Sequence, residues 1–164
     1  MKILVAGATG NTGLRLMNTL VSQGHSPVAL VRESSDTSGL PAGAEQRMGD
    51  LADLHDGVCD GCEAVIFAAG SGGDTDADMT DKIDRDGAIS LIDHAAKAGV
   101  SRFVMLSSVG ADDPDPDTGI GHYLQAKHDA DAYLKESGLT YAILRPVALT
   151  DDDGAGDVVL GDAV

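Results

Sequence analysis

Short apolar runs alternate along this chain with segments of helical periodicity. The unbroken apolar runs lie at residues 3–6, 28–31, 64–68, 103–106 and 141–144. Unbroken apolar strands are typical of a parallel sheet with both faces covered, because neither side of such a strand meets water. A weaker strand is predicted at residues 45–48, so the pattern predicts six strands.

Helical segments separate these strands. Apolar residues recur at helical spacing at residues 14–21, 88–96, 122–137 and, more weakly, 51–58. Gly24, Gly99 and Gly138 follow three of these segments, where the first position beyond a helix favours glycine.

The alternation of strand and helix predicts one α/β domain over residues 1–164, a three-layer, doubly wound parallel sheet. Parallel neighbours need crossover connections, which helices supply. Ligands of such sheets bind at the carboxyl ends of the strands, so the residues directly after each strand are the candidates for chemistry.

A last apolar run, 158–160, has no helix predicted after it. Either the domain is minimal or the chain is a shortened form of a longer protein, and we favour the second.

The composition is strongly acidic. The chain has 11 Lys and Arg against 27 Asp and Glu, a formal charge of −16, and acidic runs at 112–117 and 151–153 fall in predicted loops. Such a charge repels nucleic acid and anionic membranes, so neither is an expected partner. The negative charges repel one another and so destabilise the folded chain, and high salt screens this repulsion. We therefore expect a halophilic host. We expect unfolding at low ionic strength, and a melting temperature that is independent of KCl would contradict this.

Nothing in the pattern predicts a secreted, membrane-bound or metal-binding protein. We find no signal peptide and no apolar stretch of about 18 residues, and expect a cytoplasmic protein. Cys59 and Cys62 form C-x-x-C, but Asp60 and Glu63 beside them disfavour a thiolate, so we interpret them as structural thiols. The five histidines lack the spacing of metal ligands.

A glycine-rich turn, GATGNTG, follows the first strand at residues 7–13. Gly7 permits a sharp turn, Gly10 lets backbone N–H groups approach a pyrophosphate, and Gly13 allows close packing of helix on strand. The helix N-terminus adds positive potential. Polar groups around the anion come from Thr9, Asn11 and Thr12. The turn predicts a dinucleotide site.

Arg32 and Glu33 end the second strand, where dinucleotide folds read the adenosine ribose. An arginine favours the 2′-phosphate of NADP, whereas an acid favours the free hydroxyl of NAD. We favour NADP, and NAD stays open.

Two further segments follow strands. Asp50 and the amide of Leu51 are placed to meet the adenine, although Asp50 also suits a helix N-cap. Ala68, Ala69 and Gly70 are small residues where a cofactor passes close to the backbone, or where the chain simply packs tightly.

Candidate chemistry follows the fifth strand. Ser107 and Ser108 end it, and Tyr123 and Lys127 lie four apart on the next helix, hence on one face. An ammonium there lowers the pKa of a tyrosine toward acid–base work, and a serine hydroxyl binds the substrate oxygen.

The chain resembles the atypical branch of the short-chain dehydrogenase/reductase superfamily that includes NmrA-like and flavin reductase-like NAD(P)H-binding proteins. The resemblance covers nearly the whole chain. It rests on GATGNTG, GDL at 49–51, AAG at 68–70, the segment from 84 through RFVMLSS at 102–108, the Tyr123-x-x-x-Lys127 motif and SGLTYAILRP at 137–146.

The resemblance implies roles for several residues. Pro146 and Val147 would lie beside the nicotinamide, Tyr123 would be the proton donor or acceptor, Lys127 would hold the ribose, and Ser107 or Ser108 would orient the substrate. The chain departs from the family at Asp84 and Asp86, where active members commonly have an Asn, and it lacks the C-terminal substrate-binding segment of longer members.

Two functions remain in competition. The first is an NADP-favouring oxidoreductase or epimerase-like enzyme that acts on a small unidentified molecule by hydride transfer. The second is a non-catalytic NADP(H)-sensing regulator of the NmrA-like type. A monomer or homodimer is expected in either case.

Overall fold

A computed structural model describes residues 1–72, 76–150, 156 and 161 of this chain. Its centre is a six-stranded parallel sheet in the order β3-β2-β1-β4-β5-β6. The strands are β1 (Lys2–Ala6), β2 (Ser26–Val31), β3 (Glu45–Met48), β4 (Ala64–Phe67), β5 (Arg102–Leu106) and β6 (Thr140–Leu144). All six predicted strands are confirmed, as is the doubly wound α/β fold. From β1, the chain adds β2 and β3 on one side of the sheet and then β4, β5 and β6 on the other. Such sheets bind ligands at the switch point, which here lies between the neighbouring strands β1 and β4.

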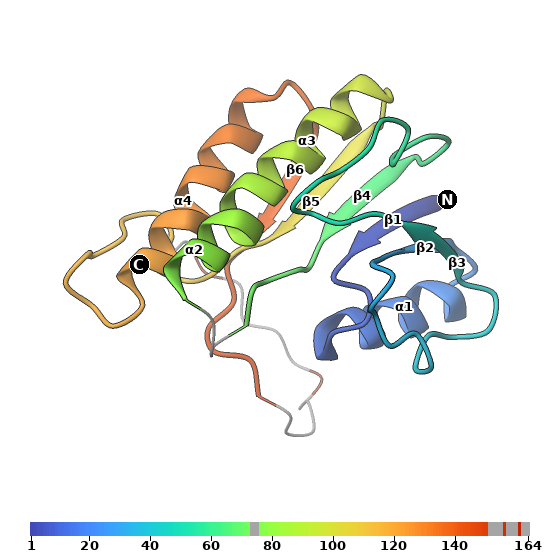
Figure 1. The fold of residues 1–164 in the computed structure, drawn as a ribbon, viewed down its shortest axis with the longest axis horizontal. Coiled ribbons are helices and arrows are strands. Elements are labelled where there is room, and N and C mark those ends of the chain that lie inside the picture. Colours follow the sequence, from blue (N-terminus) through green and yellow to red (C-terminus); the bar gives the residue numbers. More distant parts are fainter. Residues whose placement is uncertain (73–75, 151–155, 157–160, 162–164) are drawn as a thin grey trace.

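Helices cover the sheet from two sides (Figure 1). They are α1 (Asn11–Ser22), α2 (Ala77–Thr80), a π-helical segment η1 (Asp81–Gly87), α3 (Ala88–Lys97) and α4 (Gly121–Glu136). Met17 and Leu20 of α1 pack on one face of the sheet, and Leu91 of α3 and Leu134 of α4 pack on the other. The three layers arise because alternate residues of each buried strand point to opposite faces.

The predicted weak helix at residues 51–58 is wrong. That segment is a series of turns, in which the Asp50 carboxylate accepts a hydrogen bond of 2.9 Å from the Ala52 amide and Gly57 has a φ of +84°. Asp side chains compete for backbone amides in this way and favour turns over helix. Asp50 therefore caps a turn and not the helix considered for it.

The rod formed by α2, η1 and α3 begins earlier than the sequence predicted. It starts at Ala77 with the Asp76 carboxylate accepting from the Met79 amide at 2.9 Å, an N-cap bond. The π-helical turn in its middle has one extra residue per turn, and it turns Asp84 completely into the interior. Periodicity alone did not predict this carboxylate in the core.

The core is aliphatic, with Phe67 and Phe103 as its largest fully buried side chains. Cys59 and Cys62 are both buried and unpaired, and burial raises the pKa of Cys59 to about 12 and that of Cys62 above its usual value. Both are poor nucleophiles in this state, which agrees with structural thiols.

The acidic run at 112–117 is a loop as predicted, whereas the runs at 151–153 and 158–160 lie outside the described residues. Within the described part of the chain, no helix combines the length and apolar character needed to cross a membrane.

Candidate cofactor and substrate site

The glycine-rich turn has the geometry that the sequence predicted. Gly7 has a φ of +81°, and a Cβ built on it would lie 2.5 Å from the Ala68 carbonyl oxygen. A Cβ on Gly13 would collide with the Gly7 carbonyl oxygen and lie 2.8 Å from the Ala8 Cα atom. Gly7 therefore makes the turn, and Gly13 permits α1 to pack against it, as expected for these positions.

Gly10 differs from the other two glycines of the turn because it is exposed and has room around it. A Cβ there would have only the Gly7 carbonyl oxygen near it, at 3.5 Å, and Gly10 lies directly before the first residue of α1. The first turn of α1, which is fully described, contains no acidic residue. Its backbone N–H groups and helix dipole consequently offer an anion site without a competing carboxylate.

A first cavity of about 280 Å³ extends from this turn. It joins the segments that follow β1, β2, β3 and β4. The predicted cofactor residues that line it are Gly7, Thr9, Gly10, Arg32, Asp50, Leu51, Ala68, Ala69 and Gly70. Residues that follow four different strands thus line one cavity at the carboxyl ends of the strands, where the sequence predicted a ligand site.

Arg32 is exposed at the rim of this cavity. Its backbone N–H donates to the Ser35 hydroxyl at 3.0 Å, which closes a turn and directs the chain away from β2. Among the described residues, its guanidinium makes no ion pair, in contrast to Arg47 and Arg85. Arg32 is therefore available to a ligand phosphate at this edge.

The other predicted cofactor residues do not line either cavity. Asn11, Thr12 and Gly13 form the first turn of α1 behind the glycine turn. Pro146 and Val147 follow β6, and the Pro146 carbonyl accepts from the Val109 amide at 3.0 Å. That bond ties the segment after β6 to the segment after β5.

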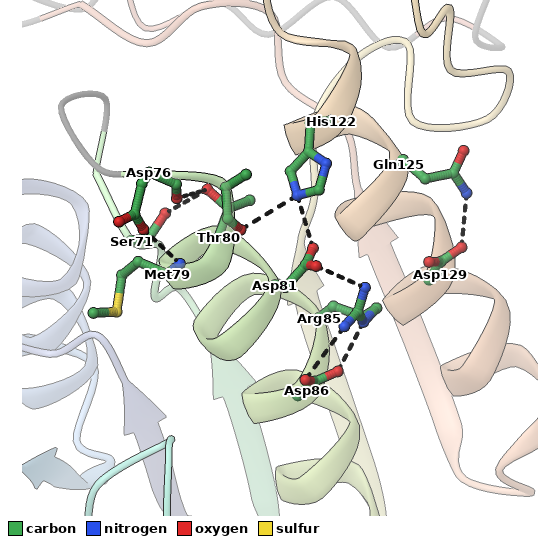
Figure 2. Close-up of polar contacts among 11 residues, drawn as sticks. Ser71, Asp76, Met79, Thr80, Asp81, Arg85, Asp86, His122, Gln125 and Asp129 are labelled. Atoms are coloured by element: carbon green, nitrogen blue, oxygen red, sulfur yellow. Dashed lines mark hydrogen bonds and ion pairs between the residues drawn. The ribbon is translucent and has the colours of Figure 1, made fainter.

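A second cavity of about 570 Å³ adjoins the first, because Gly70 and Ser71 line both. Its polar side chains are Ser71, Thr80, His122 and Tyr123. The Ser71 and Thr80 hydroxyls lie 3.2 Å apart, near the start of α2 (Figure 2). The two cavities are thus joined at the loop after β4.

Tyr123 and Lys127 share a face of α4, as predicted, with the Lys127 ammonium 5.7 Å from the centroid of the Tyr123 ring. The ammonium is buried, however, and its Nζ pairs at 3.0 Å with Oδ1 of Asp84. It also donates to the Leu106 carbonyl at 3.4 Å and lies 5.5 Å from the centroid of Phe67. Lys127 lines neither cavity.

The predicted lowering of the Tyr123 pKa is wrong for this state of the protein. Burial raises the pKa of Tyr123, the Asp84 charge raises it further, and a hydrogen bond with Ser108 opposes them by a smaller amount. The Lys127 charge is neutralised by Asp84, so it does not stabilise a phenolate as helical spacing alone suggested.

The two serines after β5 have different surroundings. The Ser107 hydroxyl is buried and donates to Oδ2 of Asp131 at 2.8 Å. Ser108 is half-buried and interacts with the Tyr123 hydroxyl. Of the two candidates, Ser108 is therefore the one placed beside Tyr123.

Within the described residues, no group of three or more His, Cys, Asp or Glu side chains is arranged to hold a metal ion.

Comparison with known proteins agrees with this geometry. A family model described as NAD(P)H-binding matches residues 7–163. The chain belongs to this NAD(P)H-binding family. It is 40% identical over 164 residues to the "Uncharacterized sugar epimerase YhfK" of Bacillus subtilis, a match that covers 96% of this chain and 77% of that protein.

Two solved structures are also similar to this NAD(P)H-binding chain. A putative NAD-dependent epimerase/dehydratase from Bacillus halodurans has a TM-score of 0.87 and 41% identity, covering 95% of this chain and 74% of the other. The oxidoreductase ylbE from Lactococcus lactis has a TM-score of 0.81 and 31% identity, covering 95% and 73%. The resemblance to atypical short-chain dehydrogenases/reductases is confirmed.

Sequence reasoning missed a buried polar cluster between α4 and the ends of β5 and β6. Asp131 of α4 is 1% exposed, and its Oδ2 accepts from Ser107 and from Nε of Arg145, the latter at 3.1 Å. The Arg145 guanidinium reaches Asp112 as well, at 3.9 Å. This cluster joins α4 to the ends of β5 and β6, and thereby fixes the segments that carry Ser108 and Pro146. The sequence signal was an Asp on the buried face of α4, a face that also carries Lys127.

Proposed function

We propose that this chain binds NADP(H) across the first cavity and acts as an oxidoreductase or epimerase-like enzyme on a small molecule in the second. The observation that carries the proposal is the junction of the two cavities at Gly70 and Ser71, with the glycine turn at one end and Tyr123 at the other. The bound nicotinamide would supply hydride transfer to or from a carbon that bears oxygen.

The residues present fit a dinucleotide. Gly10 is exposed, leaves its surroundings open and precedes the free N–H groups of α1, which suit a pyrophosphate. Small residues at 68–70 leave space along the loop after β4. In the second cavity, the protonated Tyr123 hydroxyl, held by Ser108, would donate a hydrogen bond to the substrate oxygen.

The substrate class follows less directly. The hydroxyls of Ser71 and Thr80 beside Tyr123 suit a ligand with several oxygen atoms. The Bacillus subtilis relative carries the name of a sugar epimerase, and we extend that expectation to this chain as a proposal.

The preference for NADP rests on Arg32. We expect Arg32→Ser to lower the affinity for NADPH by about 10- to 100-fold, because a charge-assisted hydrogen bond contributes about 1.5–3 kcal/mol. NADH affinity should change little.

The measurement is a titration of reduced-cofactor fluorescence in concentrated KCl, which is uncomplicated by tryptophan because the chain has none. Arg102→Ser, an exposed arginine at the opposite end of the sheet, is the control. Equal binding of NADPH and NADH by the unaltered protein would contradict the NADP preference, and binding of neither would contradict the cofactor site.

A sensing regulator is the second candidate, favoured by one observation. The Lys127 ammonium is paired with Asp84 and buried, which leaves the Tyr–Lys pair without its expected activation. Oxidation of NADPH in the presence of probe carbonyls, followed at 340 nm, distinguishes the two. Turnover that disappears in Tyr123→Phe with cofactor affinity retained supports the enzyme, whereas tight binding without turnover supports the sensor.

A further inference from the structure

His122 occupies an unusual position in the second cavity. It lies in the first turn of α4, directly before Tyr123, and lines the cavity. Its Nε2 is 2.8 Å from Oδ1 of Asp81 and 3.3 Å from the Ala77 carbonyl oxygen (Figure 2). A carbonyl oxygen and a carboxylate can only accept hydrogen bonds, so Nε2 carries a proton. In the neutral ring, Nδ1 is then the nitrogen with the lone pair.

Asp81 is itself held in place. Its other oxygen, Oδ2, pairs with the Arg85 guanidinium at 3.2 Å, and Arg85 is held in turn by Asp86 at 2.7 Å. Figure 2 shows this chain of contacts running along η1 to the imidazole. A carboxylate that fixes the tautomer and orientation of an imidazole is the arrangement used for general acid–base catalysis.

The other groups of the site cannot accept a proton near neutral pH. The pKa of Tyr123 is raised by burial and by Asp84, so its hydroxyl stays protonated. Lys127 is buried in its ion pair. Imidazole is the side chain that exchanges protons near neutral pH. The titratable groups on the helices packed against α4 are Asp76 at the N-cap of α2, Asp78 on α2, Asp81, Lys82, Asp84, Arg85 and Asp86 on η1, and Asp93, His94 and Lys97 on α3.

We propose that His122 is the proton-transferring residue of the second cavity and that Asp81 is its positioning residue. The role rests on the proposed function. When a carbonyl is reduced, the reduced dinucleotide would supply a hydride to its carbon, and Nδ1 of the His122 imidazolium would give its proton to the oxygen. The products are an alcohol, the oxidised dinucleotide and a neutral imidazole. In alcohol oxidation, Nδ1 of the neutral ring accepts the hydroxyl proton while Tyr123 stays protonated as a hydrogen-bond donor.

The test compares His122→Gln with the unaltered protein in the reduction of two probe carbonyls, phenanthrenequinone and glyceraldehyde, by NADPH. We expect kcat to fall by about 100-fold, the scale of a lost general acid, with little change in KM or in cofactor affinity. Added imidazole should restore activity to His122→Ala. His25→Gln, at the amino-terminal edge of β2, is the matched control and should behave as the unaltered protein.

Asp81→Ala gives a readout that does not depend on turnover. The ¹⁵N signals of His122, assigned by their absence in His122→Gln, should report the Nε2–H tautomer in the unaltered protein and a mixture of tautomers in Asp81→Ala. Asp81→Asn retains an acceptor for Nε2–H and should keep the tautomer.

The outcomes separate the role from the function. If the unaltered protein turns over a probe and His122→Gln keeps the same rate, His122 has no catalytic role and the proposed function stands. If the unaltered protein binds NADPH but reduces neither probe, the enzyme function is overturned and the role of His122 with it. A mixture of tautomers in the unaltered protein would overturn the positioning role of Asp81.

Discussion

Lys127→Met is expected to lower the free energy of unfolding by about 3–5 kcal/mol, the usual cost of removing one partner from a buried ion pair. Lys127 and Asp84 are 2% and 0% exposed, and their charged atoms are 3.0 Å apart. Methionine retains most of the apolar stem against Phe67 but leaves the Asp84 carboxylate without a counter-charge. Denaturant unfolding in concentrated KCl, monitored by circular dichroism, measures the loss.

A second variant separates the uncompensated charge from lost packing. Asp84→Asn combined with Lys127→Met removes both charges, and the amide oxygen can still accept the 2.9 Å hydrogen bond that the Ser71 amide donates to Asp84. We expect the double variant to be more stable than Lys127→Met alone, because desolvation of an unpaired charge is the larger part of the cost. Lys97→Met breaks a pair with Asp56 of similar length, 2.7 Å, on the exposed surface, and it should have a much smaller effect. A double variant no more stable than Lys127→Met would contradict this account.

The same ion pair shows why the candidate pair Tyr123 and Lys127 could be placed on one helix face from the sequence, although its electrostatics could not be predicted. Helical spacing correctly placed Tyr123 and Lys127 on one face, because i and i+4 positions are neighbours on any helix. The pKa of Tyr123 is raised instead by burial and, secondly, by Asp84, which a π-helical turn brings into the core from another segment. Local spacing carries no information about a partner that arrives through tertiary packing.

The fold was more accessible to sequence reasoning than the electrostatics. The five apolar runs and the weaker strand at 45–48 are each long enough to specify a strand. Helices connect β1 to β2, β4 to β5 and β5 to β6, whereas the connections on either side of β3 contain no helix. The error at residues 51–58 arose because its apolar positions also fit a series of turns. The Asp50 carboxylate, which accepts from the Ala52 amide, and the positive φ of Gly57 favour these turns over a helix. The glycine turn was placed correctly because its constraints are local.

The lining of the first cavity was predictable for a further reason. Its lining comes from residues that directly follow strands, so the sheet order alone assembles them. The second cavity shares the loop after β4 but is otherwise lined by α2, by the segment before α4 and by the start of α4, which are not tied to strand ends. His122 and Asp81 therefore had no sequence signal beyond their residue types.

Gly13→Ala is expected to destabilise the protein by about 3 kcal/mol or more, the upper range for overpacking, because the added Cβ meets the Gly7 carbonyl and the Ala8 Cα at 2.8 Å. These are backbone atoms of the turn, so α1 as a whole must move away from β1. The melting temperature in concentrated KCl measures the effect.

Gly10→Ala provides the contrast within the same turn. Its φ of −79° suits any residue, and the added Cβ would have only the Gly7 carbonyl oxygen near it, at 3.5 Å, so the melting temperature should be close to that of the unaltered protein. The methyl group would stand where a pyrophosphate approaches the α1 N-terminus, and we expect NADPH affinity to fall by at least about tenfold. Loss of stability without loss of affinity in Gly10→Ala would place the phosphates elsewhere. A stable Gly13→Ala would show that α1 can shift at little cost, and that the close helix-to-turn packing is not what requires glycine at this position.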